Sequence, residues 1–125
     1  MPATEVRVFR DTAGDVPLIA WLERLERRQP IAHAKCLACI LELARLGHEL
    51  RRPTADYLRD GIYELRARKG RVNYRILYFF HGSHAVTLSH GITKEAAVPK
   101  KEIDLAVKRK ALVAGDPDKY TADWR

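Results

Sequence analysis

The sequence has only two cysteines among its 125 residues, Cys36 and Cys39. Their CxxC spacing falls within a helical apolar pattern, not at the start of a helix that follows a strand, which argues against a redox or metal site. Two such thiols are typical of small apolar side chains in a reducing compartment. The histidines show no zinc-site spacing, so we predict neither a metal nor a cofactor; they stand at positions 33, 48, 81, 84 and 90.

Long apolar runs are also lacking. No stretch approaches the roughly 18 apolar residues of a membrane-spanning helix. The first residues do not have the basic, apolar and small-residue layout of a signal peptide. These absences predict a cytoplasmic protein without a membrane partner.

Positive charge, in contrast, is in excess. Lys and Arg number 23 against 16 Asp and Glu, which gives a net charge of +7 and a pI near 9.7. This balance favours partners that carry phosphates or acidic side chains. Charge alone does not distinguish nucleic acid, an anionic membrane surface and an acidic protein. The length and the 46% hydrophobic content predict a single domain over residues 1–114, followed by a polar, loosely held tail over 115–125.

Apolar periodicity divides the chain into a short series of elements. Alternation predicts strands over 5–10 and 85–90, and helical spacing predicts helices over 17–28, from Pro30 to Gly47, and from Pro99 onward. Residues 48–60 lack periodicity and are expected to form a loop. Two further strands, 62–68 and 71–80, flank a tip at Gly70, a residue that tolerates the positive φ of a tight β-hairpin.

This order of elements predicts an α+β fold. The sheet would be small and antiparallel, formed by the N-terminal strand and a three-strand meander. Two N-terminal helices and one C-terminal helix would cover one face and leave the other open. Alternation assigns the charged side chains of the hairpin to the open face, where either water or an anionic ligand would meet them; they are Glu64, Arg66, Arg68, Arg71, Asn73 and Arg75.

Three segments together resemble a known family: GIYELRARKGRVNYRILYFF at 61–80, HGITKE at 90–95 and PKKEIDLAVKRK at 99–110. They are similar to the RelE/ParE superfamily of toxin–antitoxin toxins, in its HigB-like, phage Gp49-like branch, over about residues 5–113. The resemblance implies a RelE-like fold and a toxin that a small helix-turn-helix antitoxin neutralises. HigB and RelE branches cut ribosome-bound mRNA without a metal, whereas the ParE branch inhibits DNA gyrase.

The same resemblance implies roles for individual residues. Arg75 matches the arginine of the family's YR-hydrophobic-hydrophobic-Y strand, which is the usual catalytic or phosphate-contacting residue. Arg66 matches a basic position of the preceding strand, and Lys94 a basic residue after the last strand. The chain departs from the branch at Glu95, where a second lysine is common.

The chemistry of these side chains fits metal-free RNA cleavage. A guanidinium can stabilise the charge that develops on phosphorus, a role we assign to Arg75. Glu64 could act as general base, but an ion pair with Arg66 or Arg75 across the hairpin is the favoured interpretation. His90 shares the parity of the core residues before it, which excludes it from the site unless a bulge intervenes.

Further basic residues are candidates for contacts to the RNA backbone. Those in the last helix fit an ordinary solvated helix exterior equally well. The candidates are Arg68, Lys69 and Arg71 in the hairpin, and Lys100 and Lys101 in the helix.

Three functions therefore compete. The first is a ribosome-dependent mRNA endonuclease toxin, with an antitoxin, the ribosome and mRNA as partners. The second is a gyrase inhibitor of the ParE type without nuclease activity. The third is an inactive prophage-derived protein that only binds its antitoxin or nucleic acid. The arginine pair favours the first, while Glu95 leaves room for the others.

Overall fold

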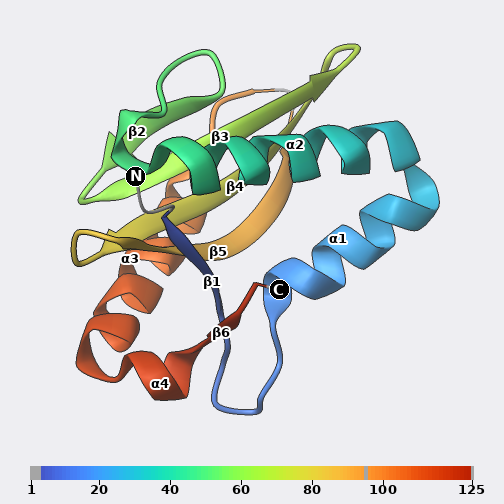
Figure 1. Cartoon of the computed structure of the whole chain (residues 1–125). Coiled ribbons are helices and arrows are strands. Elements are labelled where there is room, and N and C mark those ends of the chain that lie inside the picture. Colours follow the sequence, from blue (N-terminus) through green and yellow to red (C-terminus); the bar gives the residue numbers. More distant parts are fainter. Residues whose placement is uncertain (1–3, 95, 125) are drawn as a thin grey trace.

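The computed structural model describes residues 4–94 and 96–124. One six-stranded sheet in the order β2-β3-β4-β5-β1-β6 forms the centre of the fold, and helices pack on it (Figure 1). The predicted α+β class is confirmed. In chain order the elements are β1 (Glu5–Phe9), α1 (Pro17–Arg28), α2 (Pro30–Leu46), the 3-10 helix η1 (Gly47–Glu49), β2 (Ala55–Arg59), β3 (Ile62–Lys69), β4 (Val72–His81), β5 (Ala85–Lys94), α3 (Lys100–Gly115), α4 (Pro117–Tyr120) and β6 (Thr121–Asp123).

Helices α1 and α2 lie where the sequence predicts them. Each begins with a proline, which needs no hydrogen-bonding partner for its nitrogen in the first turn. Gln29 alone separates the two helices. Burial raises the pKa of the Cys36 thiol to about 12, with the neighbouring Cys39 adding to the shift. The buried stripe of the two helices consists of Leu18, Leu22, Leu25, Ala32, Cys36, Ile40 and Leu43.

The β3–β4 hairpin is also confirmed. Its register runs from Ile62 opposite Phe79 to Lys69 opposite Val72. Gly70 at the tip has a φ of 63°, a conformation that glycine adopts without strain. One face of the hairpin packs into the core that α1 and α2 cover, and its buried residues there are Leu65, Ala67, Tyr74, Ile76 and Tyr78.

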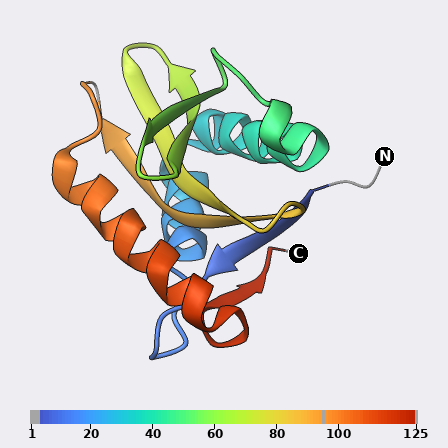
Figure 2. The same ribbon diagram turned by 90° about the vertical axis from the view of Figure 1, so that its left-hand side faces the viewer.

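The opposite face of the sheet is not open, contrary to the sequence-based expectation. Helix α3 lies on it, so that the sheet stands between α3 on one side and α1 and α2 on the other (Figure 2). A second core forms there from Ile62, Leu77 and Phe79 of the hairpin together with Ala106 and Val113 of α3. The physical reason is that the charged face is charged only toward the hairpin tip. Its other half is apolar and needs a helix to exclude water.

Two strands and one sheet pairing also differ from the predictions. Residues 55–59, expected in a loop, form the edge strand β2 on β3. Its five residues mix charged and apolar side chains, so that period-two alternation does not reveal it. The sheet is mixed, not purely antiparallel, because β1 pairs in parallel with β5. Strand β5 extends to Lys94, four residues beyond the predicted strand.

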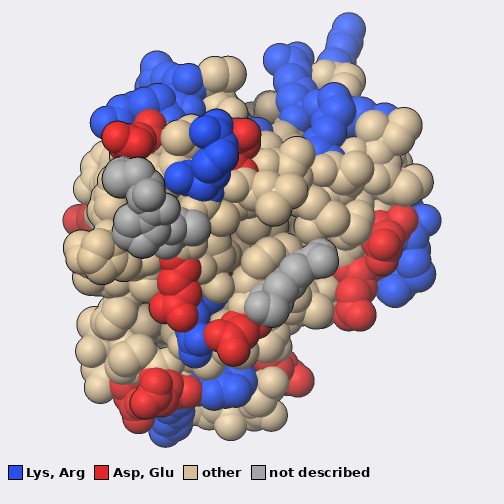
Figure 3. Space-filling model, in the orientation of Figure 1, with Lys and Arg blue, Asp and Glu red and all other residues tan. Residues whose placement is uncertain are grey.

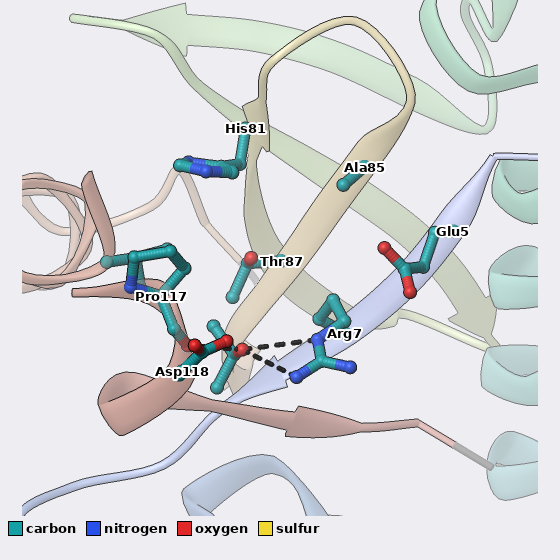
Figure 4. Close-up of a pocket in the computed structure, with 9 residues that line it drawn as sticks. Glu5, Arg7, His81, Ala85, Thr87, Pro117 and Asp118 are labelled. Atoms are coloured by element: carbon teal, nitrogen blue, oxygen red, sulfur yellow. Dashed lines mark hydrogen bonds between the residues drawn. The ribbon is translucent and has the colours of Figure 1, made fainter.

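The C-terminal segment is held more firmly than its composition suggests. Residues expected in a loose tail form α4 and then β6, which pairs with β1. Arg7 of β1 donates to Thr121 Oγ1 from Nε (3.1 Å) and Nη2 (2.9 Å), and its Nη1 bonds Asp123. This contact borders a cavity of about 270 Å³ between β1, β5 and α4 (Figure 4). Pro117, Asp118 and Thr121 of this segment line the cavity, which therefore depends on docking of the segment.

No helix in the part of the chain that the structure describes is long and apolar enough to cross a membrane.

Candidate functional site

The charged half of the hairpin face contains a chain of ion pairs in which positive and negative side chains alternate. Glu64 of β3 lies at its centre, and its Oε1 is 3.1 Å from Arg75 Nε of β4 and 3.2 Å from Arg66 Nε. Arg66 Nη2 continues the chain to Asp56 Oδ2 of β2 at 3.3 Å. Arg52, in the segment before β2, contacts the same Asp56 oxygen at 3.0 Å. The sequence predicts an ion pair of Glu64 with Arg66 or Arg75, and the structure has both.

Arg75 is enclosed, not presented to solvent. Only 10% of its side chain is exposed, and only 4% of the Glu64 side chain. Its Nη1 donates a 2.7 Å hydrogen bond to the carbonyl of Ala96, in the segment between β5 and α3. Its Nε, although close to Glu64, is not aligned for a hydrogen bond with any described residue. The buried arginine therefore has an ionic partner but an unused donor direction, an arrangement that costs desolvation free energy.

The outer end of this chain is more accessible. The Arg66 side chain is 36% exposed and that of Arg52 is 75% exposed. The guanidinium of Arg52 beside Asp56 holds the pKa of that carboxyl below its usual range. Sequence reasoning missed Asp56 and Arg52 because it assigned both to a loop. The charge alternation of these two residues with Arg66 becomes visible only once β2 is paired with β3.

A bulge in β5 decides which way His90 points. Tyr78 pairs with Leu88, whereas the preceding Leu77 pairs with His90, so that Ser89 is the extra residue. One extra residue reverses the alternation, and His90 therefore lies on the charged face with Leu77 instead of in the core with Leu88. Alternation without a bulge would place His90 in the core, as the sequence predicted, and a bulge would place it on the opposite face. The structure contains the bulge, so His90 lies on the opposite face.

His90 is nevertheless engaged by α3. Its Nε2 is 3.2 Å from Glu102 Oε1, and its Nδ1 is 2.8 Å from Ser89 Oγ. Arg109 of α3 donates to the Ser89 carbonyl at 3.3 Å and lies over the Phe9 ring. Burial lowers the pKa of His90, the charge of Arg109 lowers it further, and Glu102 opposes both. This buried polar group joins β5 to α3 beside the second core.

The family model described as Phage derived protein Gp49-like (DUF891) matches residues 20–111. The chain belongs to this family. The match runs from α1 into α3 and includes the complete ion-pair chain from Arg52 to Arg75. A search of curated proteins finds no match.

The Gp49-like family belongs to the RelE/ParE-like toxin superfamily. Membership is consistent with a toxin of a toxin–antitoxin pair, and it suggests an antitoxin as partner. The α+β architecture agrees with such a fold, although the Gp49-like chain has six strands where four were predicted.

The remaining predicted site residues of this Gp49-like chain do not all join the ion-pair chain. Arg68, Lys69 and Arg71 are exposed at the hairpin tip, where Arg68 Nε donates to the Gly70 carbonyl at 2.9 Å. Lys100 and Lys101 are exposed at the start of α3. The backbone of Lys94 pairs with Asn73 at the end of β5, but its side chain, like the whole of Glu95, lies outside the described residues.

Positive charge is unevenly distributed on the face that α2 crosses. Lys and Arg gather over the tip of the β3–β4 hairpin and over the segment between α2 and β2, while the lower half of this face carries both signs (Figure 3). The two basic areas lie near opposite ends of α2. On this face, an anionic partner of the Gp49-like chain therefore meets the greatest density of positive charge along the upper edge.

Proposed function

We propose that this Gp49-like chain is a HigB-like toxin of a toxin–antitoxin pair, and that it cleaves ribosome-bound mRNA without a metal. Its partners are then a helix-turn-helix antitoxin, the ribosome and mRNA. The observation that carries the proposal is the junction of Arg75 and Arg66 at one Glu64 oxygen, on one face of the β3–β4 hairpin. Two guanidiniums on neighbouring strands can stabilise the negative charge that develops on a phosphate in the transition state of cleavage.

In the proposed reaction the ribose 2′-oxygen bonds to the adjacent phosphorus while the bond to the 5′-oxygen breaks. The 2′-hydroxyl loses its proton to a base, the 5′-oxygen gains one, and the products are a 2′,3′-cyclic phosphate and a 5′-hydroxyl. Arg75 stabilises the extra negative charge because its planar fork holds two phosphate oxygens. Arg66 holds a neighbouring phosphate, and the resemblance to the family adds Lys94 to the site.

Access to Arg75 requires an exchange of partners. In the structure its guanidinium is ion-paired with Glu64 Oε1 and hydrogen-bonded to the Ala96 carbonyl. Phosphate oxygens would replace both, and a released Glu64 carboxylate would be free to accept the 2′-hydroxyl proton. His90 stays paired with Glu102, so we assign it to the docking of α3 and not to proton donation.

Exposed cations extend the RNA path beyond the reacting phosphate. Their contacts are to the RNA backbone, which makes them sensitive to salt and indifferent to sequence. We assign this role to Arg68, Lys69 and Arg71 at the hairpin tip and to Lys100 and Lys101 at the start of α3.

The decisive experiment maps the cleavage of a defined mRNA on translating ribosomes, in the presence of EDTA-treated protein. We expect cleavage with 2′,3′-cyclic phosphate ends, and a loss of about 100-fold or more with Arg75→Ala and Arg75→Lys, since a lost transition-state donor costs about that much. Arg45→Ala is the control, because Arg45 is exposed on α2 and pairs only with Glu42 among the described contacts. An uncleaved mRNA would refute the nuclease, and undiminished cleavage by a folded Arg75→Lys would refute the role of Arg75 in it.

The burial of Arg75 favours a second candidate. A guanidinium that is 10% exposed and ion-paired suits a structural role in a ParE-like gyrase inhibitor or in a binding protein without catalysis. In that case the protein inhibits DNA supercoiling by purified gyrase, or binds only its antitoxin, and Arg75→Lys lowers stability without abolishing either activity. A supercoiling assay with the same variants separates the two candidates.

A further inference from the structure

A hollow of about 540 Å³ lies at the β2 edge of the sheet, apart from the Arg75 site. It is larger than four other cavities of the described chain, which measure about 190 to 300 Å³, and it falls within the ~300–1,000 Å³ typical of ligand sites. The segment between α2 and β2 forms one side and β2 and β3 form the other. The lining residues are His48, Leu50, Arg51, Arg52, Ala55, Asp56, Tyr57 and Tyr63.

One wall of this pocket is aromatic and held in place. Tyr57 is 53% exposed, which is unusual for so large a side chain. Its hydroxyl accepts a 3.0 Å hydrogen bond from the Gly61 amide, and its ring meets Tyr63 edge-on at 5.0 Å. Across the pocket, the exposed His48 stacks on Phe80 at 3.6 Å. The Tyr57 ring is therefore a fixed, solvent-facing surface on which a planar group can stack.

The rim of the pocket is cationic. Arg51 and Arg52 are both exposed. Arg51 Nη1 donates to the carbonyls of His48 (2.6 Å) and Leu50 (3.4 Å), and Arg52 Nη2 contacts Asp56 at 3.0 Å. These contacts use one terminal nitrogen of each guanidinium and fix both groups at the edge of the pocket.

We propose that this pocket binds one nucleotide of single-stranded RNA, with its base stacked on Tyr57 and a flanking phosphate on Arg51 and Arg52. An aromatic face beside guanidiniums is the arrangement that binds single strands without reading their sequence. Asp56 in the lining disfavours a ligand as anionic as a nucleoside triphosphate. A strand, which carries one phosphate per base, suits two cations better.

The position of the pocket links it to the cleavage site. Asp56 lines the pocket and also ion-pairs with Arg66, which in turn contacts Glu64 beside Arg75. An RNA strand that leaves Arg66 can therefore cross the β2 edge and place a later base on Tyr57. This inference rests on the proposed function only for the identity of the RNA as mRNA. Binding itself needs no cleavage.

The test is fluorescence anisotropy of a labelled 12-nucleotide, fully 2′-O-methylated RNA with the full chain. This RNA lacks the reactive 2′-hydroxyl, so binding is measured without cleavage. We expect Tyr57→Ala to weaken binding by about 5-fold or more, because loss of one stacked base has an effect of this size. Tyr57→Phe retains the ring and should bind within about 2-fold of wild type. The double variant Arg51→Ala, Arg52→Ala should weaken binding at least as much as Tyr57→Ala.

The matched control is Arg27→Ala, Arg45→Ala, which removes the same charge from exposed positions on α1 and α2. Equal loss of RNA affinity in the two double variants would contradict the proposed RNA-binding pocket. Wild-type affinity in a folded Tyr57→Ala would contradict it as well. So would variants that keep RNA binding but lose affinity for the antitoxin, because the pocket would then be a protein-binding surface. If ribosomal cleavage is absent while Tyr57-dependent RNA binding persists, only the proposed nuclease fails.

Discussion

The two faces of the β3–β4 hairpin differ in how far their apolar rows extend. The face under α1 and α2 stays buried from Tyr78 to Ala67, close to the tip. The face under α3 is apolar at Leu77 and Phe79 and then changes to Arg75 and its ion-pair partner Glu64. The change occurs within one strand, with no loop or domain boundary. In this fold the candidate site begins where the second core ends.

The largest effect is expected from Phe79→Ala, on the α3 face. Phe79 is 1% exposed, and truncating a buried Phe leaves a cavity, so we expect a loss of about 4 kcal/mol in the free energy of unfolding. Ile76→Ala on the other face should give a loss of similar size. Urea denaturation measures both. A loss below about 1 kcal/mol for Phe79→Ala alone would mean that α3 does not cover this face.

A somewhat smaller effect is expected at the charged half of the same face. Glu64→Gln leaves the buried Arg75 without its ionic partner and should lower the free energy of unfolding by about 3 kcal/mol. The double variant Glu64→Gln, Arg75→Met removes both charges and should recover most of that loss. Glu42→Gln, in an exposed pair on α2, should change stability by less than about 0.5 kcal/mol.

These Glu64 variants test whether the two charges of the buried pair depend on each other. If single and double variants are equally unstable in urea, Glu64 and Arg75 are not energetically coupled. The ion pair between these two buried side chains would then contribute nothing to stability.

The smallest effect on the free energy of unfolding is expected from the contact of His90 in β5 with Glu102 in α3. The pKa of His90 is lowered in the folded chain, chiefly by burial and then by Arg109, so the unfolded chain binds the proton more readily. The stabilisation is therefore complete above the ordinary histidine pKa of about 6.5 and is lost as the pH falls below it. We expect the free energy of unfolding to fall more steeply between pH 7 and pH 5 for wild type than for His90→Asn.

The exposed His84 in the turn before β5 offers the control for this titration. His84→Asn should retain the wild-type slope. Parallel slopes for wild type and His90→Asn would show that the contacts of His90 with Glu102 and Ser89 do not couple α3 to pH.

Local patterns in the sequence suffice for much of this fold. Helices α1 and α2 are marked by leading prolines and apolar stripes, and the hairpin by Gly70 between alternating runs. The hairpin also predicts that Glu64, Arg66 and Arg75 share one face, because alternation has a fixed period of two. The Glu64 ion pair follows directly from that arrangement.

The remaining features depend on contacts between distant segments. Alternation predicts that β1 and β5 are strands, but it does not predict that they pair in parallel. It also does not predict that β6 returns to pair with β1. The bulge at Ser89 turns His90 around without any local residue that demands it. Helix α3 packs on the face that carries Ile62, Leu77 and Phe79 because these side chains are apolar. The sequence did not predict this, since the arginines on the same face indicated a solvent-exposed surface. Asp56 and Arg52 were missed for the same reason as β2.

The alternation of charge from Arg52 to Arg75 has a consequence for ionic strength. An RNA phosphate that binds a paired arginine there releases counterions condensed on the RNA. The displaced Glu64 or Asp56 carboxylate takes up a cation in return, so the net release is small. Salt would therefore weaken binding mainly through the exposed Arg51 and the hairpin-tip cations. The slope of log affinity against log salt concentration would thus count only the unpaired cations on the RNA path, while the Arg75 contact would persist at high salt.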